Sequence, residues 1–134
     1  MVTKQRVLLV GATGYLGRFL LKELKSQGYW VRALRRSNTK IEPVKQYCDE
    51  QILGEVTKPE TINGVCKNID IVFSSLGITR QKDGLTYMDV DYQANRNILN
   101  EALRENVKTF MYVSVFSARP KTVIFPNLCV RLKL

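Results

Sequence analysis

The sequence contains no histidine among its 134 residues. Histidine is the commonest general base near neutral pH and the commonest metal ligand in proteins. Serine–histidine catalysis and histidine-ligated metal chemistry are therefore excluded for this chain alone. The sequence has only three cysteines, Cys48, Cys66 and Cys129, and they form no C-x-x-C pair. Neither a disulfide framework nor a zinc site is indicated, and a reducing cytoplasm is the expected compartment.

Long apolar runs and negative charge are also scarce. No segment approaches the ~18 apolar residues of a membrane span. At the N-terminus, Lys4 and Arg6 precede only a short apolar run, so we expect no signal peptide. Twelve acidic residues against 21 basic ones give a net charge of +9. The basic residues are spread along the chain without a nucleic-acid motif, so neither a membrane nor a nucleic acid is an expected partner.

The most informative stretch that is present runs over residues 7–19, with the sequence VLLVGATGYLGRF. Its non-alternating apolar residues indicate a strand buried on both faces of a parallel sheet. Gly11, Gly14 and Gly17 follow with the spacing G-x-x-G-x-x-G, which is typical of a dinucleotide-binding turn. Gly11 would adopt a conformation closed to residues with a Cβ, Gly14 would admit a pyrophosphate, and Gly17 would pack the helix on the strand. We expect the phosphates at the helix N-terminus.

The helix after this turn is predicted to be amphipathic. Its apolar face is expected to consist of Leu16, Phe19, Leu20 and Leu24, which share one side of a helix. Gly28 is the predicted stop of this helix.

The remainder of the chain alternates strand-like and helix-like segments. Further strands are predicted at residues 29–34, 51–53, 69–75 and 110–115, and helical segments at 44–47, 62–67 and from 86 to about 106. Two of these helices have predicted N-terminal caps, Thr57 with Glu60 around Pro59, and Thr86 with Asp89. The apolar side of the last helix would contain Val90, Ala94, Ile98 and Leu103. The pattern predicts an α/β fold with a doubly wound, Rossmann-type parallel sheet of about five strands in the order 3-2-1-4-5.

The end of the second predicted strand indicates which cofactor is preferred. NAD-binding folds place an acid there for the ribose hydroxyls, whereas NADP-binding folds place an arginine there for the 2′-phosphate. This chain has Arg35 and Arg36 with no acid nearby. Because a guanidinium matches a phosphate in charge and geometry, the sequence favours NADP over NAD.

Five segments together resemble one protein family. GATGYLG, VRALRRS, IVFSSLGITR, VDYQANRNIL and FMYVSVFSA are similar to the atypical, NmrA-like branch of the short-chain dehydrogenase/reductase superfamily, over about residues 5–118. The resemblance implies an oxidoreductase family and a set of cofactor-binding residues. The pyrophosphate would lie along Gly11, Thr13, Gly14, Tyr15 and Leu16, with Gly17 completing the turn.

The resemblance also assigns the other parts of the cofactor. Arg35 and Arg36 would bind the 2′-phosphate, and Glu55 stands where the family usually has an aspartate beside the adenine. Ser75, Leu76 and Gly77 would pass beneath the ribose and the nicotinamide-side phosphate, and Ser114 would face the nicotinamide. Asn97 resembles the helix asparagine that braces the strand ends.

The chain departs from the family after the fifth predicted strand. Residues 1–118 are expected to form the NAD(P)-binding domain and residues 119–134 an atypical C-terminal tail. Active members of the superfamily generally carry a Tyr-x-x-x-Lys pair there, whereas the tail RPKTVIFPNLCVRLKL contains no tyrosine. The tail is either a short edge strand covering the fifth strand or an unrelated sequence where a longer chain was cut short, and we favour the second. In both cases the uncovered edge would destabilise the monomer or promote self-association.

Two functions remain open at this point. The first is an NADP-dependent oxidoreductase of the short-chain type, for which this chain supplies the cofactor-binding part without the substrate-binding half. The second is a non-catalytic NADP-binding protein, either a redox sensor or a truncated remnant.

Overall fold

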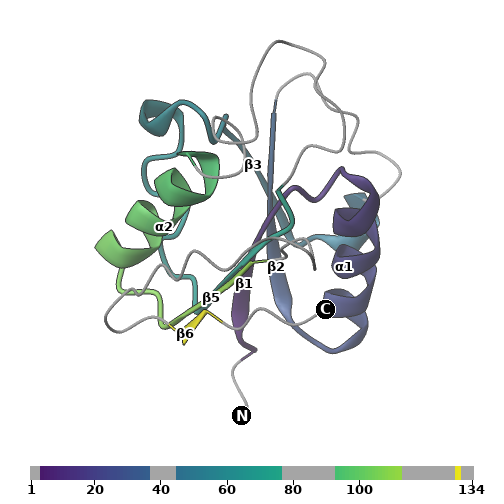
Figure 1. Ribbon diagram of the computed structural model, residues 1–134. Helices are drawn as coiled ribbons and strands as arrows, with labels where there is room; N and C mark the ends of the chain where they lie inside the picture. The colour runs from purple at the N-terminus through teal and green to yellow at the C-terminus, as the bar shows by residue number, and fades with distance from the viewer. Residues whose placement is uncertain (1–3, 37–44, 77–92, 113–128, 131–134) are drawn as a thin grey trace.

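The computed structural model describes residues 4–36, 45–76, 93–112 and 129–130, and these form a parallel sheet with helices on both sides (Figure 1). The strands are β1 (Arg6–Val10), β2 (Trp30–Arg35), β3 (Glu50–Leu53), β4 (Ile71–Ser74), β5 (Thr109–Tyr112) and β6 (Cys129–Val130). The helices are α1 (Tyr15–Ser26), α2 (Asn95–Arg104) and the 3-10 turns η1 (Lys45–Tyr47) and η2 (Pro59–Thr61).

The strand order in the described part is β3-β2-β1-β4-β5-β6, and every neighbouring pair is parallel. The predicted α/β fold and the order 3-2-1-4-5 are therefore confirmed. A sixth strand is added to that order, because Cys129 and Val130 pair with Thr109 and Phe110. This part of the tail is an edge strand beside β5, while residues 113–128 and 131–134 lie outside the described residues. Self-association through this edge stays a prediction.

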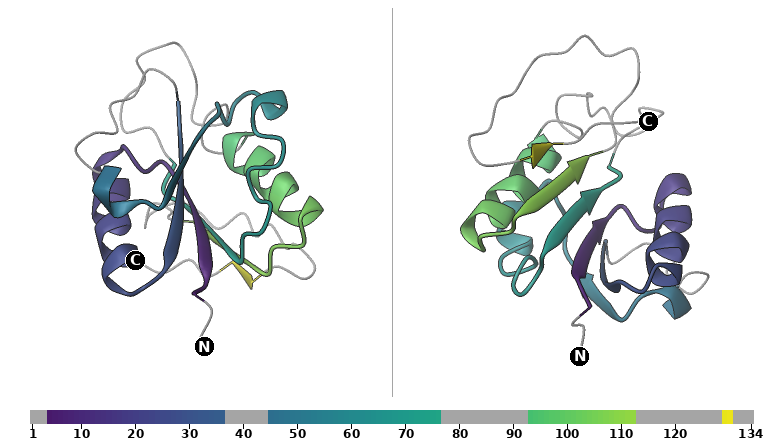
Figure 2. Two further views of the ribbon diagram at one scale, coloured as in Figure 1. Left: turned by 180° about the vertical axis from the view of Figure 1, so that it is seen from behind. Right: turned by 90° about the horizontal axis from the view of Figure 1, so that it is seen from below.

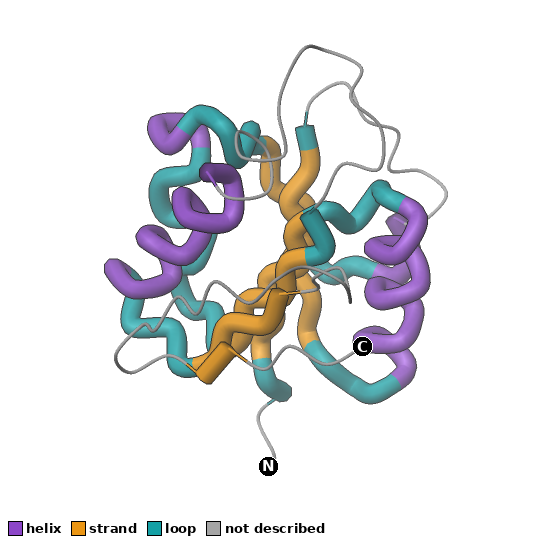
Figure 3. The backbone as a smooth tube through the Cα atoms, in the orientation of Figure 1, coloured by secondary structure: helices purple, strands orange, loops and turns teal. Residues whose placement is uncertain are grey.

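The sheet separates α1 on one side from α2 on the other, as the views from behind and from below in Figure 2 and the backbone tube in Figure 3 show. On the side of α1, Leu9 of β1 packs in a cluster with Leu21, Val31 and Ala33. On the side of α2, Leu8 and Val10 belong to a second cluster that includes Ile98 and Phe110. Successive residues of a strand point to opposite faces. Because both faces of β1 are covered, its non-alternating apolar run is buried throughout, as predicted.

The helix ends follow local sequence signals. Gly28 adopts a φ of +85°, and its N–H donates to the carbonyl of Lys25 at 3.1 Å. The next N–H, that of Tyr29, reaches back to the carbonyl of Leu24 at 3.1 Å, which completes a Schellman motif. The predicted helix stop at Gly28 is therefore confirmed.

The predicted apolar face of α1 is wrong for two of its four residues. Leu20 and Leu24 are half-buried against the core, but Leu16 and Phe19 are 36% and 58% exposed. The leucine of this helix that is fully buried is Leu21. Gly17 lies four residues before Leu21 on the same side of the helix. The close approach at Gly17 turns this side toward the sheet, and Phe19 is therefore directed away from it.

The predicted helix over residues 62–67, with its capping box, is also wrong. These residues form turns, with Gly64 at a φ of +78° and Asn68 at +59°. The carbonyls of Val65 and Lys67 accept hydrogen bonds from the Arg32 side chain, which comes from β2. The only helical turn in this part of the described chain is η2, and it has no side-chain cap.

The other predicted elements are found with shifted ends. The short helix near residues 44–47 is η1, and the strands predicted at 29–34, 51–53 and 69–75 are found with ends shifted by one or two residues. In the long helix, Ala94 and Ile98 are buried as expected, but Leu103 is 44% exposed. The predicted cap at Thr86 and Asp89, together with Val90, lies outside the described residues.

Candidate functional site

The carboxyl ends of the parallel strands meet at one edge of the sheet. Val10 lies opposite Leu34 and Ser74, and Arg35 lies opposite Leu53. The segments after β1, β2, β3 and β4 therefore leave the sheet at the same edge. In open α/β sheets, this edge is where ligands bind.

The turn between β1 and α1 is closed too tightly to admit side chains at two of its glycines. Gly11 has a φ of +85°, and a Cβ there would lie 2.7 Å from the Oγ of Ser75. A Cβ on Gly17 would lie 1.8 Å from the Gly11 carbonyl oxygen, far inside any van der Waals contact. The conformational roles predicted for Gly11 and Gly17 are therefore confirmed.

Gly14 differs from the other two glycines. It is the N-cap of α1 in an extended conformation, with φ −73° and ψ 172°, and its N–H donates to the Gly11 carbonyl at 3.1 Å. A Cβ added there would meet the Gly11 oxygen at 3.4 Å, an ordinary contact. The protein itself therefore does not require glycine at this position.

The N-terminus of α1 is suited to an anion. It has neither a side-chain cap nor an acidic residue in the first turn. The first backbone N–H groups of a helix have no intrahelical acceptor, and the helix dipole places partial positive charge there. Tyr15 and Leu16 would therefore contribute their backbone N–H groups. Thr13 lies just before them, and its carbonyl accepts a hydrogen bond from Arg18 Nε at 3.1 Å.

Ser75 connects the end of β4 to the glycine turn. Its Oγ donates to the carbonyls of Val10 and Gly11, at 3.0 and 3.2 Å, and its N–H also donates to Val10 at 3.0 Å. Leu76 is half-buried against the core on the α2 side. The predicted residues Gly77 and Ser114 lie outside the described residues.

A neighbouring serine that was not predicted to belong to the site fixes α2 to the sheet. The Oγ of Ser74 is fully buried and donates to Asn95 Oδ1 at 2.5 Å. The polar residues in the apolar run IVFSS are the only signal in the sequence for this contact.

Arg35 and Arg36 stand together where β2 ends, as predicted. Arg35 is half-buried, and its Nε donates to Gln51 Oε1 at 3.3 Å, while Nη1 donates to the Arg36 carbonyl at 3.4 Å. Arg36 is exposed. Gln51 was not predicted as part of the site, because its relation to Arg35 depends on the register between β2 and β3.

Glu55 lies beside this basic end, just after β3. The hydroxyl of Thr57 donates to its carboxylate at 3.0 Å, and Lys58 Nζ lies 3.4 Å from it. The hydrogen bond from Thr57, together with Lys58 and the nearby charge of Arg36, lowers the pKa of the Glu55 carboxyl from its usual value. Glu55 is therefore an anionic hydrogen-bond acceptor at neutral pH.

Asn97 on α2 braces the segment that follows β3. Its side chain is buried, Nδ2 donates to the Val56 carbonyl at 2.8 Å, and Oδ1 accepts from Gln93 at 3.0 Å. The resemblance implied that Asn97 braces the strand ends, and its hydrogen bond to Val56 holds the loop that carries Glu55.

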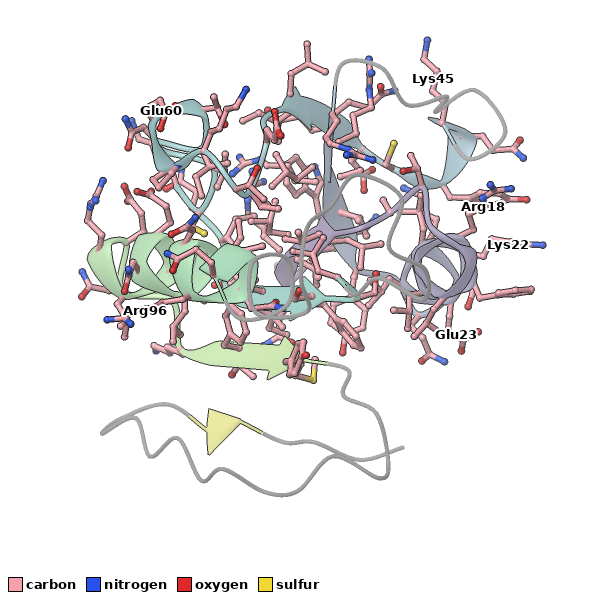
Figure 4. The ribbon with its side chains drawn as sticks, turned by 45° about the horizontal axis from the view of Figure 1, so that its top comes forward. Arg18, Lys22, Glu23, Lys45, Glu60 and Arg96 are labelled. Atoms are coloured by element: carbon pink, nitrogen blue, oxygen red, sulfur yellow. The ribbon has the colours of Figure 1, made fainter. Side chains whose placement is uncertain are left out.

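A separate cavity of about 210 Å³ lies between η2 and α2. It is lined by Pro59, Glu60, Ile62, Asn63, Asn97, Asn100, Glu101 and Arg104, and no residue of the glycine turn contributes. Figure 4 shows Glu60 and Arg96 on this side of the molecule and Arg18, Lys22 and Glu23 on the side of α1. Because the glycine turn and the uncapped N-terminus of α1 lie at the open sheet edge, this cavity is not the candidate site.

In the described part of the chain, no group of three or more cysteine, aspartate or glutamate residues could hold a metal ion. None of the helices described is both long enough and apolar enough to cross a membrane.

Comparisons with known proteins agree with this geometry. A family model described as NAD(P)H-binding matches residues 11–127. The photosystem II assembly factor Ycf39 of Synechocystis is 34% identical over 113 residues, which cover 84% of this chain and 34% of that protein. The chloroplastic divinyl chlorophyllide a 8-vinyl-reductase of Arabidopsis thaliana is 29% identical over 131 residues, covering 89% of this chain and 31% of the reductase.

A solved structure shows the same fold. The UDP-glucose 4-epimerase of Stenotrophomonas maltophila, solved with bound NAD, superposes with a TM-score of 0.73 at 19% identity, covering 84% of this chain and 38% of the epimerase. This chain spans about a third of the length of the curated relatives described above.

Proposed function

Because this chain belongs to the NAD(P)H-binding family, we propose that it forms the cofactor-binding part of a short-chain-type oxidoreductase that uses NADP(H). Its resemblance to the short-chain dehydrogenase/reductase superfamily is supported by the family match over residues 11–127 and by its reductase relative. When bound, the nicotinamide would supply or accept the hydride.

The observation that carries the proposal is the glycine turn. Because Gly11 and Gly17 have no side chains, the backbone turns directly from β1 into α1. The packing around the turn is too close to admit a Cβ at either position. The uncapped N-terminus of α1 then faces the edge where the strands end. Backbone N–H groups in this arrangement bind phosphate. We infer that the first turn of α1 holds the pyrophosphate and that Gly14 keeps the approach open.

The preference for NADP(H) rests on the arginines that end β2. Arg35 and Arg36 supply positive charge at the position where the adenosine 2′-phosphate lies in related folds. Glu55 lies at the end of the next strand, where its carboxylate is engaged by Thr57 and Lys58. We infer that Arg35 and Arg36 bind the 2′-phosphate and that Glu55 lies beside the adenine.

Calorimetric titration of the chain with NADPH and NADH in parallel, at fixed moderate salt, tests this function. We expect NADPH to bind more tightly than NADH. Replacing Arg35 and Arg36 together with alanine should weaken NADPH by ~2–4 kcal/mol and NADH far less, because each charged hydrogen bond is worth ~1–2 kcal/mol. The control is Lys45→Ala with Lys67→Ala, which removes the same charge from exposed positions elsewhere.

Two outcomes would contradict the proposal. Equal losses for both cofactors in the double arginine variant would reject the 2′-phosphate role. If the folded chain binds neither cofactor, the whole site is wrongly assigned.

A second function is favoured by one specific observation. The Synechocystis relative at 34% identity is named as an assembly factor and not as a reductase. A non-catalytic NADP-binding module, such as a redox sensor, would use the same glycine turn and arginines. The two functions differ in turnover. Loss of NADPH absorbance with carbonyl or quinone acceptors would support the oxidoreductase, whereas tight binding without turnover would favour the module.

A further inference from the structure

Two arginines of β2 are held by the neighbouring strand β3 in chemically different ways. Arg32 is only 7% exposed, and its Nε donates to the carboxylate of Glu50 at 2.9 Å. Its Nη1 donates to the carbonyls of Val65 and Lys67, at 2.8 and 2.9 Å. The charge of Arg32 is therefore paired with a carboxylate, and its Nε and Nη1 donate within the fold. This arginine is structural.

Arg35 is held by a neutral group instead. Its Nε donates to the side-chain carbonyl Oε1 of Gln51 at 3.3 Å. Arg35 lies opposite Leu53 and Ala33 lies opposite Gln51, so Arg35 and Gln51 are diagonal neighbours on one face of the sheet. An amide oxygen can orient a guanidinium without cancelling its charge.

The backbone of Arg35 is fixed as well. Its carbonyl accepts a hydrogen bond from the Gly54 N–H at 3.0 Å, which continues the pairing of β2 with β3 to the end of the strand. Within the described residues, the side chain uses only Nε and Nη1. An arginine has five N–H donors, so most of them remain for an anion at the sheet edge.

We propose that Gln51 is a positioning residue that aims Arg35 at the 2′-phosphate and thereby sets the preference for NADPH over NADH. This inference rests on the proposed function. A guanidinium that is already oriented loses less rotamer freedom when the phosphate binds. A carboxylate at position 51 would instead pair with Arg35, as Glu50 pairs with Arg32, and would compete with the phosphate.

The test compares Gln51→Glu and Gln51→Met with the wild type in titrations with NADPH and NADH. Gln51→Glu should weaken NADPH binding about tenfold, and Gln51→Met about threefold, with less than about a twofold change for NADH. Gln27→Met is the matched control, because Gln27 is exposed at the end of α1, away from this edge. It should leave both affinities unchanged.

A double-mutant cycle separates positioning from a general structural effect. In an Arg35→Ala background, Gln51→Met should have no further effect on NADPH, because this neutral substitution acts only through Arg35. Equal weakening of both cofactors, or the same loss with and without Arg35, would overturn the inference. If the wild type prefers NADPH and Gln51→Met leaves the ratio of the NADPH and NADH affinities unchanged, the inference is overturned as well. If the wild type binds both cofactors equally, the NADP preference in the proposed function fails first, and the role of Gln51 fails with it.

Discussion

Replacing Gly17 with alanine is expected to destabilise the domain strongly. The new Cβ would lie 1.8 Å from the Gly11 carbonyl oxygen and 2.7 Å from its carbonyl carbon. Both are backbone atoms in a turn fixed by Ser75, so no side-chain rotation relieves the overlap. Overpacking of this kind costs about 1–3 kcal/mol or more, against a gain of about 1 kcal/mol from helix propensity. Because the overlap is severe, the cost lies at the upper end of this range, and we expect a net loss of about 2 kcal/mol.

The measurement is urea unfolding followed by far-ultraviolet circular dichroism, with a melting curve as a second probe. Gly14→Ala is the matched control. It makes the same chemical change three residues earlier, where a Cβ would meet only the Gly11 oxygen at 3.4 Å. Losing glycine at an N-cap should cost less than about 1 kcal/mol.

Two outcomes would contradict the close approach at Gly17. If Gly17→Ala stays within about 0.5 kcal/mol of the wild type, α1 does not approach the turn as closely as described. If the two alanine variants are equally destabilised, the loss reflects glycine as such and not the contact at Gly17.

Three further predictions concern the site and its supports. Gly14→Val should fold yet lose binding of both NADPH and NADH in calorimetry, and retained binding would reject the phosphate role of the turn. Asn97→Leu should lower the free energy of unfolding by about 1–3 kcal/mol, because the partly buried carbonyl of Val56 loses its donor; an unchanged urea midpoint would show that the brace is unimportant. Partial burial raises the pKa of Asp49, but hydrogen bonds from Lys25 and the Val31 N–H outweigh it, so the net pKa is lowered from 3.8. The ionised carboxylate therefore stabilises the fold above about pH 4, and this contribution is lost as pH falls through the lowered pKa. Asp49→Asn should accordingly reduce the loss of stability on acidification from pH 5 to pH 3, and an unchanged pH dependence would contradict this.

The strands and the first turn could be predicted because their signals are local. The apolar run of β1 reflects burial on both faces, and Gly28 ends α1 because few other residues adopt its φ of +85°. The predicted glycine turn likewise needs only the positive φ of Gly11 and the missing side chain of Gly17.

The predictions of local structure were wrong where contacts with distant segments decide the conformation. Residues 62–67 have an apolar pattern typical of a short helix, yet the carbonyls of Val65 and Lys67 bind Arg32 from another strand. Thr57 has the spacing of a helix cap, but its hydroxyl bonds Glu55 instead. Leu16 and Phe19 are exposed because the packing at Gly17 selects the side of α1 that meets the sheet.

The sequence by itself determined the order of strands and helices, the glycine turn and the presence of arginines at the end of β2. It could not distinguish the roles of Arg32 and Arg35, which are the same residue type on one strand. That distinction was decided by the parallel register of β2 with β3, which places the carboxylate of Glu50 against one guanidinium and the neutral amide of Gln51 against the other. The physical reason is that the charge state of a hydrogen-bond acceptor decides whether an arginine is neutralised within the fold, and the tertiary structure supplies that acceptor.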